Sequence, residues 1–242
     1  MKLDYTNVPA TINKKRIRRA NDGSLFIANP NAKDLKDMDK LFIRIKGYKK
    51  WMPHIETEMT DEVMLNIFQG KGCYIVGKGP SLDNLNASYF PEDWPIIAIN
   101  EAIYKVEGLV NNRLFCMHLD RFKITTDAHP ITIYEHYTAF EDLSKAYLFS
   151  RYSIKGSFLS ALYAIQICKK FKTSEFNMLC FDAAVNKKLT YAKCTNAKAE
   201  QGGKVTRFLK HAKQIRESLR FVPHTFTIPL VDSIEISETS SD

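Results

Sequence analysis

The chain has 242 residues, of which 45% are hydrophobic and 26% are charged, with 10 Gly and 9 Pro. These proportions are typical of soluble globular proteins and exclude a disordered, collagen-like or low-complexity chain. No stretch approaches the roughly 18 consecutive apolar residues that a membrane span needs, and the first 19 residues lack the apolar segment of a signal peptide, so we expect a cytoplasmic protein without integral membrane contact.

Five cysteines are distributed along the chain without a pattern that indicates a disulfide framework or a zinc site. Their number is odd, and no two of them form a C-x-x-C pair, the spacing typical of such sites. Most of them lie within apolar runs. We predict reduced thiols with a mainly structural role at these positions: Cys73, Cys116, Cys168, Cys180 and Cys194.

The formal net charge of +8 is unevenly distributed. Residues 145–220 carry 16 basic and 4 acidic side chains, a net +12, whereas residues 73–144 carry 5 basic and 10 acidic ones, a net −5. Such a basic block suits a polyanionic partner, namely a nucleic acid, an anionic membrane surface or a phosphorylated substrate. A solvated, lysine-rich helical surface is the alternative.

Residues 1–70 are polar and lack a regular pattern, so we predict a helical or irregular N-terminal extension there. Residues 41–51 interleave aromatic and basic side chains, which either grip a nucleic-acid backbone or cover the flank of a domain. Apolar residues at helical spacing predict a helix within residues 56–68. The candidate nucleic-acid contacts are basic residues of this extension and of a later basic helix: Lys14, Lys15, Arg16, Arg18, Arg19, Lys204, Arg207 and Lys210.

From residue 72 onward, short apolar runs alternate with helical patterns, which is typical of parallel α/β folds. Strands are predicted within residues 73–77, 96–100, 113–120, 146–150 and 175–182, and helices within 156–171 and 204–219. We therefore predict an α/β domain over residues 71–230, a mostly parallel, Rossmann-like sheet flanked by helices, followed by an acidic tail over residues 231–242.

The first strand of this domain runs into the segment Gly77-Lys78-Gly79-Pro80-Ser81. Two glycines permit a ligand to approach the backbone closely, and the proline favours the first turn of a helix that Ser81 can cap. Exposed N–H groups at the start of such a helix bind phosphate. The segment is neither a G-x-G-x-x-G dinucleotide fingerprint nor a Walker A loop. A G-x-G turn after a strand is also common as a simple tight turn.

Three ordered blocks of the sequence resemble a known group of transferases. These blocks are the run IVGKGPSLDNL, the strand that ends in Asn100, and the stretch from Gly156 to Asp182. They are similar to blocks in the family 42 bacterial sialyltransferases and in the domain-of-unknown-function 115 proteins, which include motility accessory factors and an archaeal hydroxymethylpterin pyrophosphokinase. The resemblance spans residues 73 to about 220 and implies a Rossmann-type sheet, a GT-A variant, whose carboxyl ends bind a nucleotide or nucleotide-sugar.

The resemblance also implies which residues contact the nucleotide-sugar. The loop after the first strand and Asn100 would hold the nucleotide, Gly156 and Ser157 would lie beside its base or ribose, and Tyr191 would hold phosphate. The full set is Gly77, Lys78, Gly79, Pro80, Ser81, Asn100, Gly156, Ser157 and Tyr191.

The chain departs from the sialyltransferase pattern at two points. The run EQGGKV stands where those enzymes place a catalytic histidine, and Ala184 stands where they place a second phosphate-holding tyrosine. The departures favour a related transferase with another donor over the transfer of sialic acid.

Glycosyl transfer needs a base that takes the proton of the acceptor hydroxyl. The strand within residues 113–120 ends with His118 and Asp120, and their alternation puts both on one face near the carboxyl edge of the sheet. We predict this pair as the general base and its partner, and the alternative is a hydrogen-bonded strand end with a turn cap. Asp182, at the end of another strand, is the second candidate, with a helix or turn cap as its alternative.

No cofactor is predicted, because basic side chains can neutralise a departing diphosphate without a metal. Asp37 and Asp39 have the Asp-x-Asp form of a metal site but lie in a helical, exposed pattern of the extension, and the histidines lack ligand spacing. The basic side chains in question come from the loop after Asp182: Lys187, Lys188, Lys193 and Lys198.

These features predict a glycosyltransferase that moves a sugar from a nucleotide-sugar to a hydroxyl. The basic residues favour DNA as the acceptor, for example a hydroxymethylated base in phage-type DNA that is flipped out of the duplex, which would place the protein in the host cytoplasm. The alternatives are sialyltransferase-like transfer to a surface glycan, a magnesium-dependent pyrophosphokinase, and a non-catalytic nucleotide- or DNA-binding module.

Overall fold

The computed structural model describes most of the chain from residue 57 onward and four strands before it. The described residues are 17–19, 25–28, 42–45, 48–51, 57–119, 122–133, 139–149, 159–186, 191–195 and 205–230. Of residues 17–51, 186 and 205–208, only the backbone is described.

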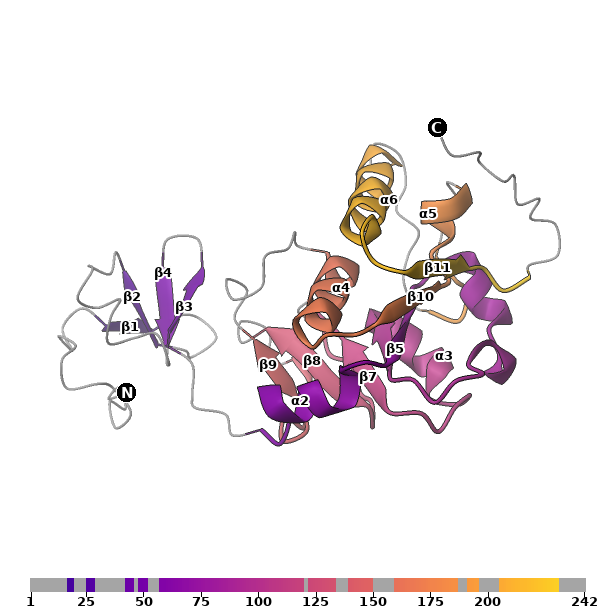
Figure 1. Cartoon of the computed structure of the whole chain (residues 1–242). Helices are drawn as coiled ribbons and strands as arrows, with labels where there is room; N and C mark the ends of the chain where they lie inside the picture. Colours follow the sequence, from indigo (N-terminus) through magenta and orange to yellow (C-terminus); the bar gives the residue numbers. More distant parts are fainter. Residues whose placement is uncertain are drawn as a thin grey trace.

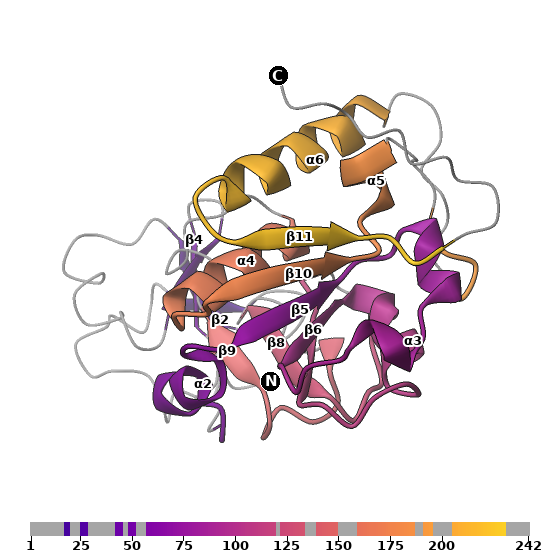
Figure 2. The same ribbon diagram turned by 45° about the vertical axis from the view of Figure 1, so that its right-hand side comes forward.

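A seven-stranded sheet forms the centre of the molecule (Figure 1, Figure 2). All neighbouring strands in it are parallel, and their order is β11-β10-β5-β6-β7-β8-β9. The sheet confirms the predicted α/β, Rossmann-like fold. Its strands are β5 (Gly72–Val76), β6 (Ile96–Ile99), β7 (Leu114–Met117), β8 (His129–Ile133), β9 (Tyr147–Phe149), β10 (Glu175–Leu179) and β11 (His224–Thr227).

Two of these strands, β8 and β11, are not among those predicted from the sequence. Strand β8 contains Pro130, which lacks the backbone N–H of a ladder and usually indicates an edge strand or no strand at all. Here the proline is the second residue of a strand that pairs on both sides. Strand β11 is short, polar and at the edge of the sheet, where Phe226 is only half-buried.

Both faces of the sheet are covered, because successive side chains of each strand point to opposite faces. Cys73 and Ile75 of β5 belong to one apolar core, and Tyr74 and Val76 belong to the other. Strands buried on both faces are continuous apolar runs in the sequence. This explains why periodicity located β5 and β6 correctly.

Helices of different kinds cover the two faces. The first core contains residues of α2 (Asp61–Phe68), α4 (Ser160–Lys170) and α6 (Val205–Leu219). The second contains residues of the 3-10 helix η2 (Pro80–Asn84), of η4 (Asn100–Ala102) and of α3 (Ile103–Val106). A further 3-10 helix, η3 (Ala87–Tyr89), follows η2, and a short helix, α5 (Asp182–Asn186), follows β10 and contacts α6.

The helix α2 precedes the domain boundary expected at residue 70 but packs within the domain. Its N-cap is Thr60, whose hydroxyl accepts the Val63 N–H at 3.3 Å. At its other end, the Phe68 ring lies 5.3 Å from the Phe115 ring of β7. The packed unit therefore begins before residue 71.

The described part of the N-terminal extension consists of strands, where we expected helical or irregular structure. Four short strands form a separate antiparallel sheet in the order β1-β2-β4-β3. The alternation of aromatic and basic residues in 41–51 is a strand pattern, and a two-residue connection that ends in Gly47 is typical of a hairpin. The strands are β1 (Ile17–Arg19), β2 (Leu25–Ala28), β3 (Phe42–Ile45) and β4 (Tyr48–Trp51).

Candidate functional site

The candidate site lies at the point where the order of the strands reverses. The chain runs outward from β5 through β6, β7, β8 and β9, and then returns to place β10 on the other side of β5. In open α/β sheets, ligands bind outside the carboxyl ends of the strands at such a switch point. The loop Gly77–Ser81 follows β5 and Asp182 follows β10, so two of the predicted motifs meet there.

The loop after β5 packs directly on the backbone that leaves β10. The Gly77 N–H donates to the Leu179 carbonyl at 2.8 Å, and the Gly79 N–H donates to the Cys180 carbonyl at 2.9 Å. A Cβ at Gly79 would lie 1.8 Å from Asp182 Oδ2, and a Cβ at Gly77 would lie 2.7 Å from the Cys180 oxygen. Both glycines are therefore required by close packing within the protein.

Asp182 is fully buried and binds the start of η2. The Ser81 hydroxyl donates to Asp182 Oδ2 at 2.8 Å, and the Ser81 backbone N–H lies 3.3 Å from Oδ1 and 3.4 Å from Oδ2. The sequence predicted that Ser81 caps a helix whose N–H groups are open to phosphate. Instead, the Asp182 carboxylate accepts the backbone N–H of Ser81, and the helix that begins there, η2, is a short 3-10 helix.

Lys78 is the cationic group of the loop. Its ammonium group lies 2.6 Å from Glu101 Oε2 and 4.7 Å from the centre of the Tyr191 ring. The side chains of Lys78 and Glu101 are only 14% and 12% exposed. Tyr191, which was predicted to hold phosphate, is therefore brought to the loop, although it lies 113 positions after Lys78 in the sequence.

Asn100 and His118 are also brought together at this edge of the sheet. Asn100 Oδ1 lies 3.0 Å from His118 Nδ1, and His118 Nε2 lies 2.8 Å from the Phe122 carbonyl oxygen. Asn100 has a φ of 52°, in the left-handed region where asparagine is more common than most residues. Cys180, at the end of β10, has a φ of 61°, and such conformations concentrate at functional sites.

His118, the predicted base, is buried and has a polar neighbour at each ring nitrogen. The side chain is fully buried, it packs edge-on against Phe122 and Phe140, and both ring nitrogens lie beside oxygen atoms. A ring in this position takes a proton from an acceptor only if Asn100 or Phe122 moves away from its nitrogen. The geometry favours the alternative, a hydrogen-bonded residue at the end of a strand. The predicted partner Asp120 lies outside the described residues.

A segment between Tyr191 and Thr195 is attached to the loop by backbone hydrogen bonds. The Ala192 N–H donates to the Lys78 carbonyl at 2.9 Å, and the N–H groups of Lys193 and Cys194 donate to the Asp83 carboxylate, each at 2.8 Å. Partial burial tends to raise the pKa of Asp83, but these hydrogen bonds outweigh it and lower the pKa.

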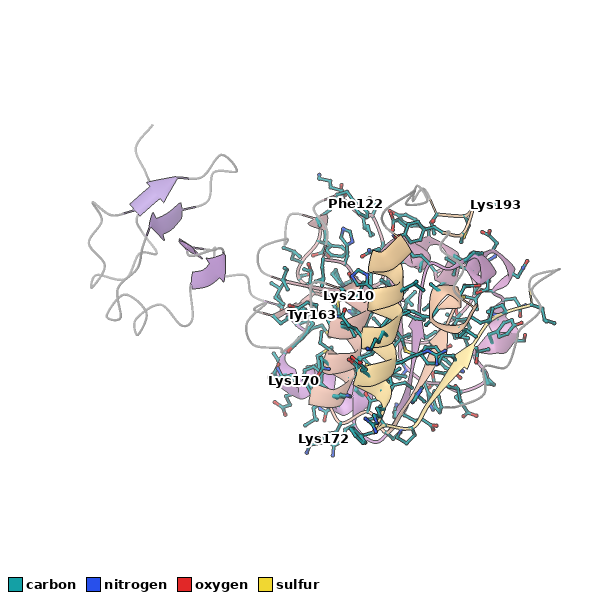
Figure 3. All side chains as sticks on the ribbon, turned by 90° about the horizontal axis from the view of Figure 1, so that it is seen from above. Phe122, Tyr163, Lys170, Lys172, Lys193 and Lys210 are labelled. Atoms are coloured by element: carbon teal, nitrogen blue, oxygen red, sulfur yellow. The ribbon has the colours of Figure 1, made fainter. Side chains whose placement is uncertain are left out.

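Several of the residues predicted to contact the nucleotide-sugar or a nucleic acid are not described. Among the nucleic-acid candidates, Lys210 lies on α6, where it is exposed (Figure 3). Arg18 and Arg19 belong to β1 and Arg207 to α6, but only their backbone is described. The candidates outside the described residues are Lys14, Lys15, Arg16, Gly156, Ser157, Lys187, Lys188, Lys198 and Lys204.

All five cysteines are free thiols. Four of them are buried, and burial raises the pKa values of Cys73, Cys116 and Cys180. Cys194 is exposed at the surface, but partial burial of its sulfur together with the Asp83 carboxylate raises its pKa to about 11.

Two further findings concern the described residues as a whole. None of their helices is long and apolar enough to cross a membrane. No group of three or more His, Cys, Asp or Glu side chains among them is arranged to hold a metal ion.

A surface pocket of about 400 Å³ lies at the opposite, amino edge of the sheet. It is lined by α2 together with Lys71, Asp93 and Arg113, which are all exposed. The pocket lies at the ends of β5, β6 and β7 that are away from the predicted motifs, so it belongs to a different part of the surface from the candidate site.

In comparisons with known proteins, no family model and no curated protein matches this chain.

The tight contact between Gly79 and Asp182 predicts that Gly79→Ala destabilises the domain. We expect the free energy of unfolding to fall by more than about 3 kcal/mol, because the new methyl group would overlap a buried carboxylate and a backbone carbonyl. Gly108→Ala is the control, since a Cβ there meets no atom within 4 Å. Urea unfolding measures both variants, and equal stabilities would contradict the described packing.

The hydrogen bonds of Asp83 predict that Asp83→Asn activates the thiol of Cys194. Loss of the carboxylate lowers the pKa of Cys194, so at pH 8 the thiolate fraction and the rate of alkylation by iodoacetamide should rise about tenfold. Asp142→Asn is the matched control, because this exposed carboxylate caps Ser144 away from the site. An alkylation rate that is unchanged in Asp83→Asn would contradict the contact between the Asp83 carboxylate and Cys194.

Proposed function

We propose that the chain is a glycosyltransferase that moves a sugar from a nucleotide-sugar to a hydroxyl group, with DNA as the acceptor. The observation that supports this most is the position of Lys78, Tyr191 and Asn100 at the carboxyl ends of β5 and β6, beside the switch point. Nucleotides bind at this position in open α/β sheets.

The ammonium group of Lys78 is the feature of the site that supports an anionic donor. Lys78 is a cation on the turn between β5 and η2, and the ring of Tyr191 restricts its position. In the transfer, the acceptor oxygen forms a bond with the anomeric carbon, the bond from that carbon to the phosphate oxygen breaks, and the electron pair leaves on the nucleotide phosphate. A fixed ammonium group stabilises the negative charge that develops there.

The proton of the acceptor hydroxyl has to reach a base during the same step. Asp182 is bound by Ser81 and His118 by Asn100, so in this arrangement both side chains position the loop and the strand end. Asp120 comes directly after Leu119 in the sequence and lies outside the described residues. We therefore assign the role of base to Asp120 within this proposal, and give His118 and Asp182 positioning roles.

A non-catalytic nucleotide-binding module is the second candidate. The observation that favours it is the burial of His118, which leaves the strand end without an exposed imidazole. The two proposals differ in one result: both predict nucleotide binding, but only the transferase releases a nucleoside diphosphate or monophosphate from its sugar conjugate.

Binding of a nucleotide to Lys78 can be tested by thermal unfolding with CMP, UDP, GDP and their sugar conjugates. At about 100 times its Kd, the correct nucleotide should raise the Tm by roughly 5–10 °C. Lys78→Met should weaken its affinity at least about tenfold, because a charge-assisted contact with phosphate is lost. Lys145→Met, which removes an exposed lysine next to β9, is the control. If no nucleotide stabilises the protein, the transferase proposal is wrong.

Binding to DNA can be tested by gel shifts of duplex DNA at about 50 mM salt, where phosphate contacts are strong. The double variant Lys210→Ala/Lys213→Ala removes two exposed charges of α6. We expect it to weaken binding and to reduce the slope of log K against log salt by about 2. Lys145→Ala should leave the slope unchanged. An absence of binding by the wild-type protein would exclude DNA as the acceptor.

A further inference from the structure

Lys78, which was predicted to bind the nucleotide, is paired with a carboxylate of the protein itself, Glu101. A phosphate-binding loop needs donors that are free to meet the ligand, yet the ammonium group of Lys78 lies 2.6 Å from the Glu101 carboxylate. Lys78 directly follows Gly77 at the end of β5, and Glu101 follows Asn100 at the end of the neighbouring strand β6. The carboxylate therefore occupies the position that a ligand phosphate would take.

Four backbone N–H groups at this turn are already hydrogen-bonded within the protein. The N–H groups of Gly77 and Gly79 bind carbonyls that leave β10, the N–H of Ser81 binds Asp182, and the N–H of Leu82 binds the Gly79 carbonyl. Pro80 has no N–H. An anion that approaches this turn therefore meets the side chain of Lys78 as its charged donor.

We propose that the ligand phosphate replaces Glu101 on Lys78, and that Glu101 thereby selects the ligand. This inference rests on the proposed function, because it concerns the same site. The exchange favours a phosphate group with two negative charges, which binds the ammonium more strongly than a single carboxylate does. The released carboxylate accepts hydrogen bonds, so the ligand class is a diphosphate or phosphate ester that carries hydroxyl groups next to the charged part.

Replacement is favoured over simple addition of the ligand. The ring of Tyr191 lies over the ammonium group at 4.7 Å, and the two charged side chains expose only 14% and 12% of their area. A phosphate added beside Glu101 would place two anions next to one cation in a poorly solvated site, where like charges repel strongly. Movement of Glu101 away from Lys78 removes this repulsion.

The pair also explains how the loop keeps its shape without a ligand. A cation that is largely buried is costly unless it is paired, and Glu101 provides the pairing when the site is empty. The Ala192 N–H, which donates to the Lys78 carbonyl, holds Tyr191 in place independently of the ion pair. Exchange at the ammonium therefore leaves the backbone of the loop in position.

The test compares Glu101→Gln with the wild-type protein by calorimetric titration with CMP, UDP, GDP and inorganic phosphate. The neutral amide no longer competes for Lys78, so we expect binding of the nucleoside diphosphate to become about tenfold tighter. Glu175→Gln is the matched control, since it removes the same charge from an exposed position at the amino end of β10. Glu101→Asp, which shortens the carboxylate arm, should give a smaller increase and serves if Glu101→Gln does not fold.

A double-mutant cycle separates competition from a structural role of the pair. In the Lys78→Met background, Glu101→Gln should no longer tighten binding, because the cation for which the two anions compete is gone. Unchanged or weaker binding by Glu101→Gln and Glu101→Asp, while the wild-type protein binds nucleotide, would overturn the exchange and leave the proposed function intact. If Glu101→Gln gains affinity for inorganic phosphate but no nucleotide binds to any variant, the exchange holds and the nucleotide-sugar proposal fails. If nothing binds to any variant, both fail.

Discussion

The contact between the buried carboxylate of Asp182 and Ser81 is the interaction on which the candidate site depends. A fully buried carboxylate is stable only when it is hydrogen-bonded, and the backbone N–H and the hydroxyl of Ser81 both serve this purpose. The contact ties the loop after β5 to the end of β10, and it requires a glycine at position 79, where the carboxylate leaves no room for a Cβ. The side chain therefore organises the loop from inside the protein.

This arrangement determines which groups remain for a ligand. At Ser81, the internal carboxylate takes a position that an external phosphate occupies in other loops of this type, so the charge available to a ligand lies three residues earlier, at Lys78. Because β5 lies between β6 and β10, the same loop contacts Glu101 on one side and Asp182 on the other. Tyr191 completes the surroundings of Lys78 from a segment that Asp83 holds in place. The charge of Lys78 is thus compensated by Glu101, whereas Lys210 and Lys213 on α6 remain exposed.

Periodicity and composition predicted the parts of the fold that are defined by local sequence. Strands β5 and β6 are apolar runs that end in a turn, and β10 and α6 lie within their predicted ranges. Strand β8 was missed because Pro130 argues against a strand, although the pairing of its neighbours accommodates it. The contact of Ser81 with Asp182 spans 101 residues and depends on the return of the chain to β10, which no local pattern indicates. Glu101 was missed as well, but its position directly after the strand that ends in Asn100, at the same edge as Lys78, was a usable signal.

The most direct test of this account is a crystal structure of the protein with a bound nucleoside diphosphate. The account predicts a phosphate oxygen within hydrogen-bonding distance of Lys78 Nζ at the carboxyl ends of β5 and β10, with Asp182 still bound to Ser81. A nucleotide bound at another place on the molecule would contradict it, and so would a phosphate that has displaced Asp182 from the Ser81 N–H.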